Sequence, residues 1–285
     1  MPDNPNRGAV LITGASTGIG RACTEHLDSL GFTVFAGVRK QTDADSLRGI
    51  GSGRTQALML DVTDSEAIVS ALRSVDEAAP AGLAGLVNNA GIAVAGPLEF
   101  VTLDDWRRQL EVNFIGQVAV IQAALPALRR ARGRIVNMTS IGGRLASPFL
   151  GPYSASKYAL EAITDSLRLE LRPFGIAVAA VEPGAVATPI WGKGRAEAEQ
   201  ATANMPAQAM QLYRNGIEAL PKLIAQAERS GVAPLEVARA VGHALTASRP
   251  KTRYVVGRDA KARLLLTRLL PTRVMDKIVV RGMGI

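Results

Sequence analysis

The 285-residue sequence is poor in cysteine, histidine and long apolar runs, and each shortage narrows what the protein can be. A single cysteine, Cys23, cannot form an intrachain disulfide, so a reducing compartment is expected. The two histidines, His26 and His243, are too far apart in the chain to suggest a metal site. The N-terminus lacks an apolar signal-peptide core, and no run of about 18 apolar residues could span a bilayer. We therefore expect a cytoplasmic protein without a metal.

Acidic residues are scarce at the end of the chain. The net charge is +8, and residues 250–285 contain nine Lys/Arg and only two Asp/Glu, which accounts for nearly all of the excess. The remainder of the chain is almost neutral, so a general nucleic-acid-binding surface is not indicated. Because 47% of the residues are apolar, the chain is able to bury a large core.

A glycine-rich segment follows the first apolar run. Residues 9–12 predict a buried strand, residues 13–20 contain the spacing G-x-x-x-G-x-G, and residues 21–30 predict a helix. In this context Gly14, Gly18 and Gly20 let the backbone approach a pyrophosphate at a helix N-terminus. The alternative is an ordinary tight turn between a strand and a helix.

The end of the second predicted strand, residues 32–36, lacks an acidic residue. An NAD site usually has a carboxylate here to bind the adenosine ribose, but residues 37–40 contain Arg39 and Lys40 instead. Asp43 and Asp45 come later, in the next predicted helix. Arg39 offers a planar guanidinium for a 2′-phosphate, which favours NADP over NAD. The alternative is two solvated surface charges.

Small and polar residues follow the third and fourth predicted strands. Asp61 comes after residues 56–60, where it is able to hydrogen-bond an adenine amino group. Residues 63–66 resemble a capping box that opens a helix to Ala78. Residues 85–87 lead into Asn88-Asn89-Ala90-Gly91, which suits the ligand crevice at the carboxyl edge of an open α/β sheet.

A pair of ionisable residues four positions apart gives the strongest catalytic signal. Tyr153 and Lys157 lie on one face of a predicted helix that ends near Leu171. An ammonium beside a phenol lowers the phenol pKa and suits it to general acid/base chemistry. The alternative is an ordinary solvated pair on a helix surface. Ser140 ends the strand over residues 133–138, and a loop of small residues would bring its hydroxyl beside Tyr153.

One more polar residue lies in an apolar setting. Asn113 falls within a long helix that starts at Thr102 or Asp104 and continues through Arg130, with a bend expected at Pro126. An Asn among apolar neighbours is either a packing residue with satisfied hydrogen bonds or a site residue.

The last third of the chain carries a long insertion. After a strand at 176–181, Pro183-Gly184 opens a stretch to about residue 232, with helical pieces at 195–203 and 208–224. Such an insertion is typical of a substrate-covering lid. A helix at 234–247 and a strand at 253–256 follow. The alternation predicts a single doubly wound, Rossmann-like α/β domain over residues 1–285, with a mostly parallel seven-stranded sheet.

The C-terminal extension, about residues 258–285, alternates apolar and basic residues near helical spacing, and Pro271 divides it. Its apolar residues are Leu264, Leu265, Leu266, Leu269, Leu270, Val274, Met275, Ile278 and Val279. We expect this face to pack on the domain or cover the substrate cleft. The alternative is weak peripheral contact with an anionic membrane.

Four signatures in the same order resemble the short-chain dehydrogenase/reductase family: residues 13–20, residues 88–91, Ser140 with Tyr153 and Lys157, and Pro183-Gly184. Within that family, residues 60–64, 96–99 and 249–254 are similar to the 17β-hydroxysteroid and retinol dehydrogenase branch. Arg39 matches the position at which NADP-preferring members carry arginine.

The resemblance implies roles for single residues. Tyr153 would exchange a proton with the substrate oxygen, Ser140 would polarise that oxygen, and Lys157 would hold the nicotinamide ribose and tune Tyr153. Asn113 would fix a water that links Lys157 to solvent. No catalytic position departs from the family pattern. The implied cofactor-binding residues are Gly14, Ser16, Thr17, Gly18, Ile19, Gly20, Arg39, Asp61, Val62, Asn89, Ala90, Gly91, Tyr153, Lys157, Pro183, Gly184, Val186 and Thr188.

The expected function is an NADP(H)-dependent oxidoreductase that interconverts an alcohol and its ketone or aldehyde on a hydrophobic, steroid-, retinoid- or lipid-like substrate. A 3-ketoacyl thioester reductase and a non-catalytic NADP-binding module are the alternatives. The long lid and basic tail argue against the former. By analogy with the family, a homodimer or homotetramer is expected to form through the helices that carry Asn113 and Tyr153.

Overall fold

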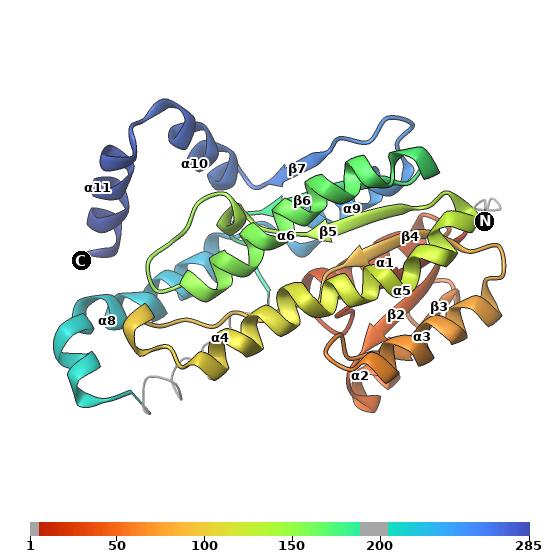
Figure 1. The fold of residues 1–285 in the computed structure, drawn as a ribbon, viewed down its shortest axis with the longest axis horizontal. Coiled ribbons are helices and arrows are strands. Elements are labelled where there is room, and N and C mark those ends of the chain that lie inside the picture. Colours follow the sequence, from red (N-terminus) through yellow and green to blue (C-terminus); the bar gives the residue numbers. More distant parts are fainter. Residues whose placement is uncertain (1–5, 189–204) are drawn as a thin grey trace.

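The computed structural model describes residues 6–188 and 205–285, which form a seven-stranded sheet with helices on both faces (Figure 1). The strand order is β3-β2-β1-β4-β5-β6-β7, and every neighbouring pair is parallel. The expected sheet is therefore confirmed, and it is entirely rather than mostly parallel. The strands are β1 Ala9–Ile12, β2 Thr33–Val38, β3 Thr55–Met59, β4 Leu83–Asn88, β5 Arg134–Met138, β6 Ala177–Pro183 and β7 Arg253–Val256.

The helices alternate with the strands up to β7. They are α1 Gly18–Ser29, α2 Gln41–Leu47, α3 Ser65–Ala78, α4 Leu103–Leu110, α5 Gly116–Ala131, α6 Gly151–Glu170, α8 Ala207–Ser230, α9 Pro234–Thr246, α10 Arg258–Leu269 and α11 Thr272–Met283. Short 3₁₀ segments are η1 Leu98–Phe100, η3 Ile141–Gly143 and η4 Arg172–Phe174, and η2 Glu111–Ile115 is a π-helical turn. The predicted helix at 195–203 lies outside the described residues.

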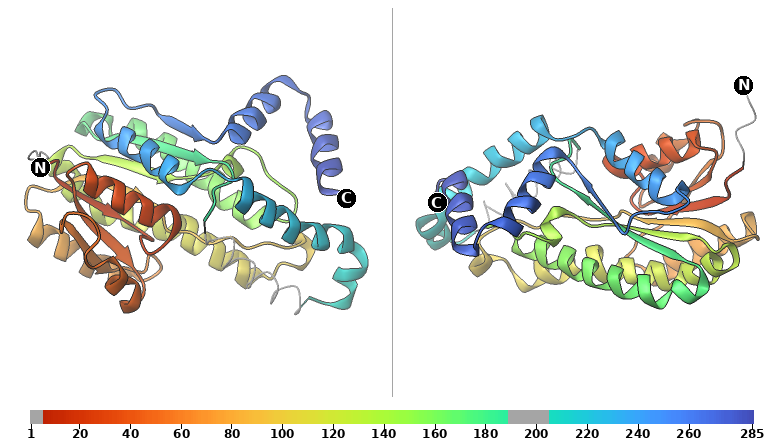
Figure 2. Two further views of the ribbon diagram at one scale, coloured as in Figure 1. Left: turned by 180° about the vertical axis from the view of Figure 1, so that it is seen from behind. Right: turned by 90° about the horizontal axis from the view of Figure 1, so that it is seen from above.

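Alternate residues of β1 reach two separate cores. Val10 and Ile12 lie in a cluster with Leu27 of α1 and Val241 of α9, whereas Leu11 lies in a second cluster beneath α3 and α5. Both faces of the sheet are therefore covered, which explains why the strands are apolar throughout. Figure 2 shows the two helical layers from behind and from above.

The strand order reverses direction at β1. From β1 the chain moves to β2 and β3 on one side, and to β4, β5, β6 and β7 on the other. In open α/β sheets a ligand crevice forms at this point, outside the carboxyl ends of the strands. The predicted glycine-rich turn follows β1 and therefore lies at this crevice.

Two helix details differ from the sequence predictions. Asp64, not Thr63, caps α3, because its carboxylate accepts hydrogen bonds from the backbone N–H groups of Glu66 and Ala67. The predicted long helix begins after the cap Thr102, as expected, but the π-helical turn η2 interrupts its regular spacing at Asn113. Such turns are rare and often lie at functional sites.

The helical stretch Leu103–Ala131 is long and apolar enough, by length and composition alone, to cross a membrane. No such segment was expected, because the sequence has no uninterrupted apolar run of this length. Val120, Ile121 and Leu128 of this stretch are buried in the core beneath the sheet. In all, 39% of the apolar window is buried, so only part of this stretch packs against the core.

The tail differs from the packed arrangement we expected. Helices α10 and α11 extend from the body after β7 (Figure 1). Ala260 and Met275 are buried, but most of the other apolar side chains are not. The exposed ones are Leu265, Leu266, Leu269, Val274, Ile278 and Val280. Packing on the domain thus accounts for only a small part of the apolar surface of the tail.

Candidate active site

The glycine-rich turn is built around positions that exclude side chains. Gly14 has φ +64°, and a Cβ there would lie 2.9 Å from the backbone of Ala90. A Cβ on Gly20 would lie 2.1 Å from the Gly14 carbonyl oxygen. The turn therefore presents bare backbone at the N-terminus of α1, after the exposed Thr17. This arrangement fits a pyrophosphate, which such N-termini favour.

Residues of the fourth strand end hold this turn in place. The Asn89 side-chain amide donates to the carbonyls of Thr13 and Gly14, each at 3.0 Å. The Thr13 hydroxyl accepts from the backbone N–H groups of Asn89 and Ala90 at 3.0 Å. Asn89 thus braces the turn, a role that the sequence analysis did not assign to it. Thr13 was missed as a site residue, and its signal was a hydroxyl directly after a buried strand.

The residues expected around the adenosine lie at the ends of neighbouring strands. Arg39 follows β2 and is exposed, which leaves its guanidinium accessible. The Asp61 carboxylate accepts from the Thr63 backbone N–H at 3.0 Å and from its hydroxyl at 2.8 Å. Only Oδ1 makes these bonds. Val62 is buried beside it, and its carbonyl lies against Gly116.

The fold brings Ser140 and Tyr153 together, although 12 residues separate them. The Ser140 Oγ accepts from the Gly142 backbone N–H at 3.0 Å, and it lies 3.5 Å from the Pro183 carbonyl. A Cβ on Gly142 would lie 3.1 Å from the Tyr153 ring and 3.4 Å from the Ser140 hydroxyl. A larger residue at Gly142 would therefore crowd the Tyr153 ring and the Ser140 hydroxyl.

The electrostatics of the Tyr153–Lys157 pair differ from the sequence argument. Burial raises the pKa of Tyr153, and the hydrogen bond with Ser140 opposes this rise only in part. The Lys157 Nζ donates to the Met138 carbonyl at 2.8 Å and lies 5.8 Å from the centre of the Tyr153 ring. In the protein without cofactor, the ammonium therefore does not hold the phenol pKa below its usual value.

Burial also changes Lys157. It lowers the pKa of Lys157 to about 8, while the Glu161 carboxylate acts to raise it. Lys157 is only 4% exposed, which explains the size of the shift. Both members of the pair are thus poised toward their neutral forms.

Asn113 is fully buried in the π-helical turn. Its side-chain amide donates to the Ile92 carbonyl at 3.0 Å and to the Ser156 hydroxyl at 3.2 Å, and its oxygen accepts from the Ile92 backbone N–H at 2.8 Å. The side chain thus ties the segment after β4 to α6, beside Gly91. The expected link through water to Lys157 stays a prediction.

The segment after β6 closes the other side of the crevice. Pro183 ends the strand, and a Cβ on Gly184 would lie 2.7 Å from the carboxylate of Asp259. Asp259, in the first turn of α10, also accepts from the Ala185 backbone N–H at 3.3 Å. Val186 and Thr188 are buried nearby in sequence. Asp259 was missed because its partner is 74 residues away.

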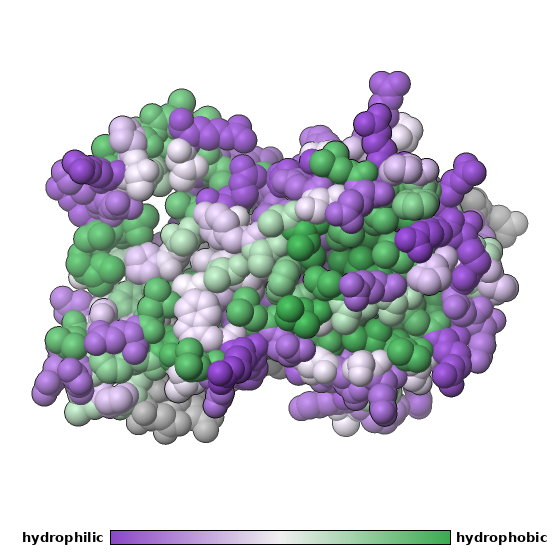
Figure 3. All heavy atoms as spheres, in the orientation of Figure 1, coloured by the Kyte–Doolittle hydropathy of each residue, from purple (hydrophilic) through white to green (hydrophobic). Residues whose placement is uncertain are grey.

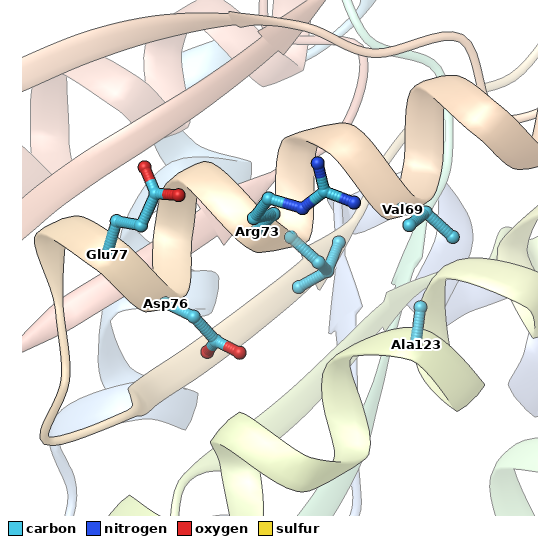
Figure 4. Close-up of a pocket in the computed structure, with 6 residues that line it drawn as sticks. Val69, Arg73, Asp76, Glu77 and Ala123 are labelled. Carbon is cyan, nitrogen blue, oxygen red and sulfur yellow. The ribbon is translucent and has the colours of Figure 1, made fainter.

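A surface hollow of about 540 Å³ lies elsewhere, between α3 and α5 (Figure 4). Its lining residues are Val69, Leu72, Arg73, Asp76, Glu77 and Ala123. The crevice lies at the loops that follow the carboxyl ends of the strands, whereas these residues lie within α3 and α5. The hollow is therefore not part of the crevice.

Comparison with known sequences places the chain in a family. Residues 8–199 match the family model described as short chain dehydrogenase. The chain is 38% identical to mouse (Mus musculus) retinol dehydrogenase 5, with 95% of this chain and 87% of that protein covered. It is 40% identical to bovine (Bos taurus) 17-beta-hydroxysteroid dehydrogenase type 6, with 96% and 88% covered.

Solved structures show the same architecture. A short chain dehydrogenase from Burkholderia cenocepacia, in complex with NADP, has a TM-score of 0.68 and 27% identity over 93% of this chain and 98% of that chain. A short chain dehydrogenase/reductase from Burkholderia phymatum, in complex with NAD, has a TM-score of 0.79 and 24% identity over 93% and 94%. The latter similarity concerns the fold alone.

The glycine turn fits a dinucleotide, and the sequence matches extend over nearly the whole chain. The expected resemblance, including its retinol and hydroxysteroid dehydrogenase branch, is thereby confirmed. The chain belongs to the short-chain dehydrogenase/reductase family and is an NAD(P)-dependent oxidoreductase of the alcohol–carbonyl type.

Proposed function

We propose that this protein is an NADP(H)-dependent oxidoreductase that interconverts a hydrophobic alcohol and its ketone or aldehyde. The observation that carries the proposal is the meeting of Ser140, Tyr153 and Lys157 next to the crevice that contains the glycine turn. Bound nicotinamide would supply or accept the hydride. The chain would supply the proton, the orientation of the substrate oxygen and the charge around it.

In this proposal Tyr153 exchanges a proton with the substrate oxygen. The Ser140 hydroxyl, already oriented by the Gly142 N–H, donates to the same oxygen and stabilises negative charge there. Lys157 contributes a positive charge within 5.8 Å of the Tyr153 ring when it is protonated. That charge favours the phenolate and lowers the free-energy cost of proton transfer. Asn113 keeps α6 in register with the segment after β4.

An aromatic cluster supports a hydrophobic substrate. Tyr213 of α8 makes edge contacts with Phe100 and Phe149, at 6.0 and 6.4 Å between ring centres. Phe149, four residues before Tyr153, has φ +64° and packs against Gly216 of α8. A bulky residue held in this strained conformation is often part of a functional site. The names of the retinol and hydroxysteroid dehydrogenase relatives point to the same substrate class.

Steady-state turnover tests the proposal. We expect NADPH oxidation with steroid- and retinoid-like carbonyls, and much slower turnover of an acetoacetyl thioester. A preference for the thioester would support the 3-ketoacyl reductase instead. NADP binding without turnover across a broad panel of ketones and alcohols would support the non-catalytic binding module.

The cofactor preference is tested at Arg39. Arg39→Ala removes the exposed guanidinium that we assign to the 2′-phosphate, so kcat/KM for NADPH should fall by roughly 10-fold to 100-fold while that for NADH is nearly unchanged. Arg48→Ala, a similarly exposed change at the end of α2, is the matched control. Equal losses with both cofactors would contradict the assignment to NADP.

We further propose that the tail contacts an anionic membrane. On α10, Ala262, Leu265, Leu266 and Leu269 follow the i, i+3, i+4, i+7 spacing of one helix face, and all four are exposed. The surrounding cations are Lys261, Arg268, Arg273, Lys277 and Arg281, all exposed. An apolar stripe flanked by cations suits a surface with acyl chains beneath anionic headgroups.

Self-association through α5 and α6 is the remaining part of the proposal. Figure 3 shows apolar side chains gathered over these two helices on one face of the molecule. Ile115, Tyr158 and Leu169 are among the exposed apolar residues of this region. Analytical ultracentrifugation of the wild type and of Leu169→Glu would measure the oligomer, which should dissociate in the variant.

A further inference from the structure

The face of α6 that carries the catalytic pair continues into two carboxylates. Tyr153, Lys157, Glu161 and Asp165 follow one another at intervals of four residues, so each lies next to the preceding one along the surface of the helix. Glu161 is 6% exposed, so it lies almost as deep as Lys157. A buried carboxylate is costly unless cations and hydrogen-bond donors surround it. The burial of the Glu161 carboxylate therefore depends on the cations and hydrogen-bond donors around it.

Arg253 of β7 joins three carboxylates from two elements. Its guanidinium lies 3.1 Å from Glu161 Oε2 and 2.7 Å from Asp165 Oδ2 on α6. Its Nε lies 3.1 Å from Glu182 Oε1 on β6. Only arginine offers a planar fork that reaches several carboxylates at once. Arg253 thus connects α6 to β6 beneath the site.

A second arginine extends this network to the Ser140 loop. Arg144, which ends the turn after Ser140, lies 3.2 Å from the fully buried Glu182. Glu182 itself comes directly before Pro183 and Gly184. The loop of Ser140 and the loop after β6 are therefore both tied to Glu182.

The backbone beside the catalytic lysine touches the same group. A Cβ on Gly143 would lie 2.8 Å from the Lys157 carbonyl oxygen and 3.1 Å from the Glu161 side chain. The 3₁₀ turn after Ser140 is thus in close contact with the helical turn that joins Lys157 to Glu161. Glu161 Oε2 faces Arg253, whereas Oε1 is buried with no hydrogen-bond partner among the described residues. Part of its negative charge is left to act on neighbouring groups.

We propose that Glu161, held by Arg253, is a positioning residue of this active site, which supplies a negative charge one helical turn from Lys157 and fixes α6 against the Ser140 and Pro183 loops. This inference rests on the proposed function, in which Lys157 acts as a cation. It assigns no direct contact between Glu161 and substrate or cofactor. Its role would be exerted through Lys157.

The charges around Lys157 support this role. On α6 the titratable neighbours of Lys157 are Tyr153 and Glu161. Beyond Glu161 lie Arg253 of β7, Glu182 of β6 and Arg144 after η3, which are joined by ion pairs. Glu111 of the adjoining π-helical turn is exposed to solvent. Burial lowers the pKa of Lys157 to about 8 and Glu161 opposes this fall, so loss of the Glu161 charge should lower it further. Burial and the nearby Glu161 also raise the pKa of Glu182, against the effect of Arg144 and Arg253.

Lysine titration by NMR in the cofactor-free protein tests the inference directly. The chain contains seven lysines, so 13C-labelled lysine side chains give few signals, and Lys157→Met identifies the one required. In Glu161→Gln, which keeps the shape and loses the charge, the Lys157 titration midpoint should fall by roughly one pH unit. Glu170→Gln, an exposed change on the same helix, is the control and should leave it in place. An unmoved Lys157 midpoint in a folded Glu161→Gln protein would overturn the inference.

Kinetics provide the second readout. In Glu161→Gln, the alkaline limb of the kcat/KM profile for NADPH, which reports the cofactor-free enzyme, should move to lower pH by the same amount as the NMR midpoint. In Arg253→Lys, which keeps one positive charge but not the fork, kcat should fall several-fold while the Lys157 midpoint stays near the wild-type value. An unchanged kcat in Arg253→Lys would refute the positioning by Arg253.

The two readouts separate this inference from the proposed function. The NMR midpoint is measured without substrate or cofactor. If it moves in Glu161→Gln but the wild type turns over no carbonyl or alcohol, the proposed function fails while the coupling of Glu161 to Lys157 stands. If the wild type is active and neither the midpoint nor the pH profile moves, the inference alone fails.

Discussion

At the scale of single residues, the site places two ionisable side chains where burial opposes their charged forms. Burial raises the pKa of Tyr153 and lowers that of Lys157 to about 8. A neutral phenol is able to donate a proton, whereas a phenolate forms more easily when the lysine is charged. In the proposed function, the chemistry of the pair therefore depends on whether Lys157 carries its proton.

Separate replacement of Tyr153 and of Lys157 should distinguish a loss of NADPH binding from a loss of catalysis. Tyr153→Phe removes the proton donor and should lower kcat by at least 100-fold with little change in the Kd for NADPH. Lys157→Ala should lower kcat and also weaken NADPH binding, because we assign the ribose contact to it. Fluorescence titration measures the Kd, and stopped-flow absorbance measures hydride transfer. Unchanged NADPH affinity in Lys157→Ala would show that Lys157 does not combine a ribose contact with the tuning of Tyr153.

The buried lysine should also make stability depend on pH. The pKa of Lys157 is about 8 in the fold and 10.5 as a free side chain, so the unfolded chain binds more protons between these values. Stability should therefore rise with pH across this window, and below pH 8 the buried ammonium carries its full cost.

Relative to Lys157→Met, the cofactor-free wild type should gain about 2 kcal/mol in free energy of unfolding between pH 7 and pH 10. Urea denaturation at each pH measures this difference. Lys222→Met, a change at an exposed residue of α8, is the control and should keep the wild-type pH dependence. A constant difference between wild type and Lys157→Met across this range would contradict the assigned pKa.

At the scale of elements, the site is a set of strand ends braced by neighbouring segments. The amide of Asn89 and the hydroxyl of Thr13 tie the end of β4 to the turn after β1. Asp259 of α10 braces the loop after β6. Each brace comes from an element other than the one it holds, so the crevice depends on the packing of the whole sheet.

Within the glycine-rich turn, Gly20 leaves no room for a side chain. Gly20→Ala would place a Cβ 2.1 Å from the Gly14 carbonyl and 2.6 Å from the Asn89 amide, so α1 must move from the turn. We expect NADPH affinity to fall by 10-fold or more, with stability lowered by about 1–3 kcal/mol. Calorimetric titration and thermal denaturation measure the two effects. Gly282→Ala, where a Cβ meets no atom within 4 Å, is the control and should leave the affinity unchanged without lowering the stability. Normal affinity in Gly20→Ala would mean that the turn tolerates this shift.

At the scale of the whole molecule, charge and apolar surface are unevenly distributed. The body is nearly neutral, while α10 and α11 carry most of the excess cations together with exposed leucines. The same α10 begins with Asp259, which contacts the loop after β6. A membrane that binds α10 would therefore lie near the loop after β6. This position suits a substrate that is delivered from a lipid phase.

Vesicle co-sedimentation tests the membrane proposal. The full chain should bind phosphatidylglycerol vesicles, bind phosphatidylcholine vesicles weakly, and detach at high salt. Arg268→Gln with Arg273→Gln, and separately Leu265→Glu with Leu269→Glu, should each weaken binding by 10-fold or more. Val69→Glu, an exposed change on α3, is the control. Equal binding to both lipids, or none to either, would exclude the charge-based contact.

Local sequence patterns predicted the fold class, which the structure confirms, and the residues to which we assign the chemistry. Apolar runs and glycine turns are local signals, because strand burial and backbone freedom depend on neighbouring residues. They predicted each of the seven strands to within a few residues, and they predicted the order of the glycine turn, Ser140, Tyr153 and Lys157. The similarity of the chain to its relatives confirms the predicted family.

Only the tertiary structure decided how these residues are held and charged. The contacts of Thr13 and Asp259 and the Arg253 network join residues that are many positions apart in the chain. No local sequence pattern therefore predicts them. The sequence placed Lys157 beside Tyr153 and suggested a lowered phenol pKa. Burial reversed that expectation, because the desolvation of a side chain depends on everything packed around it. The tail likewise had the spacing of a packed helix, but in the structure most of its large apolar side chains are exposed.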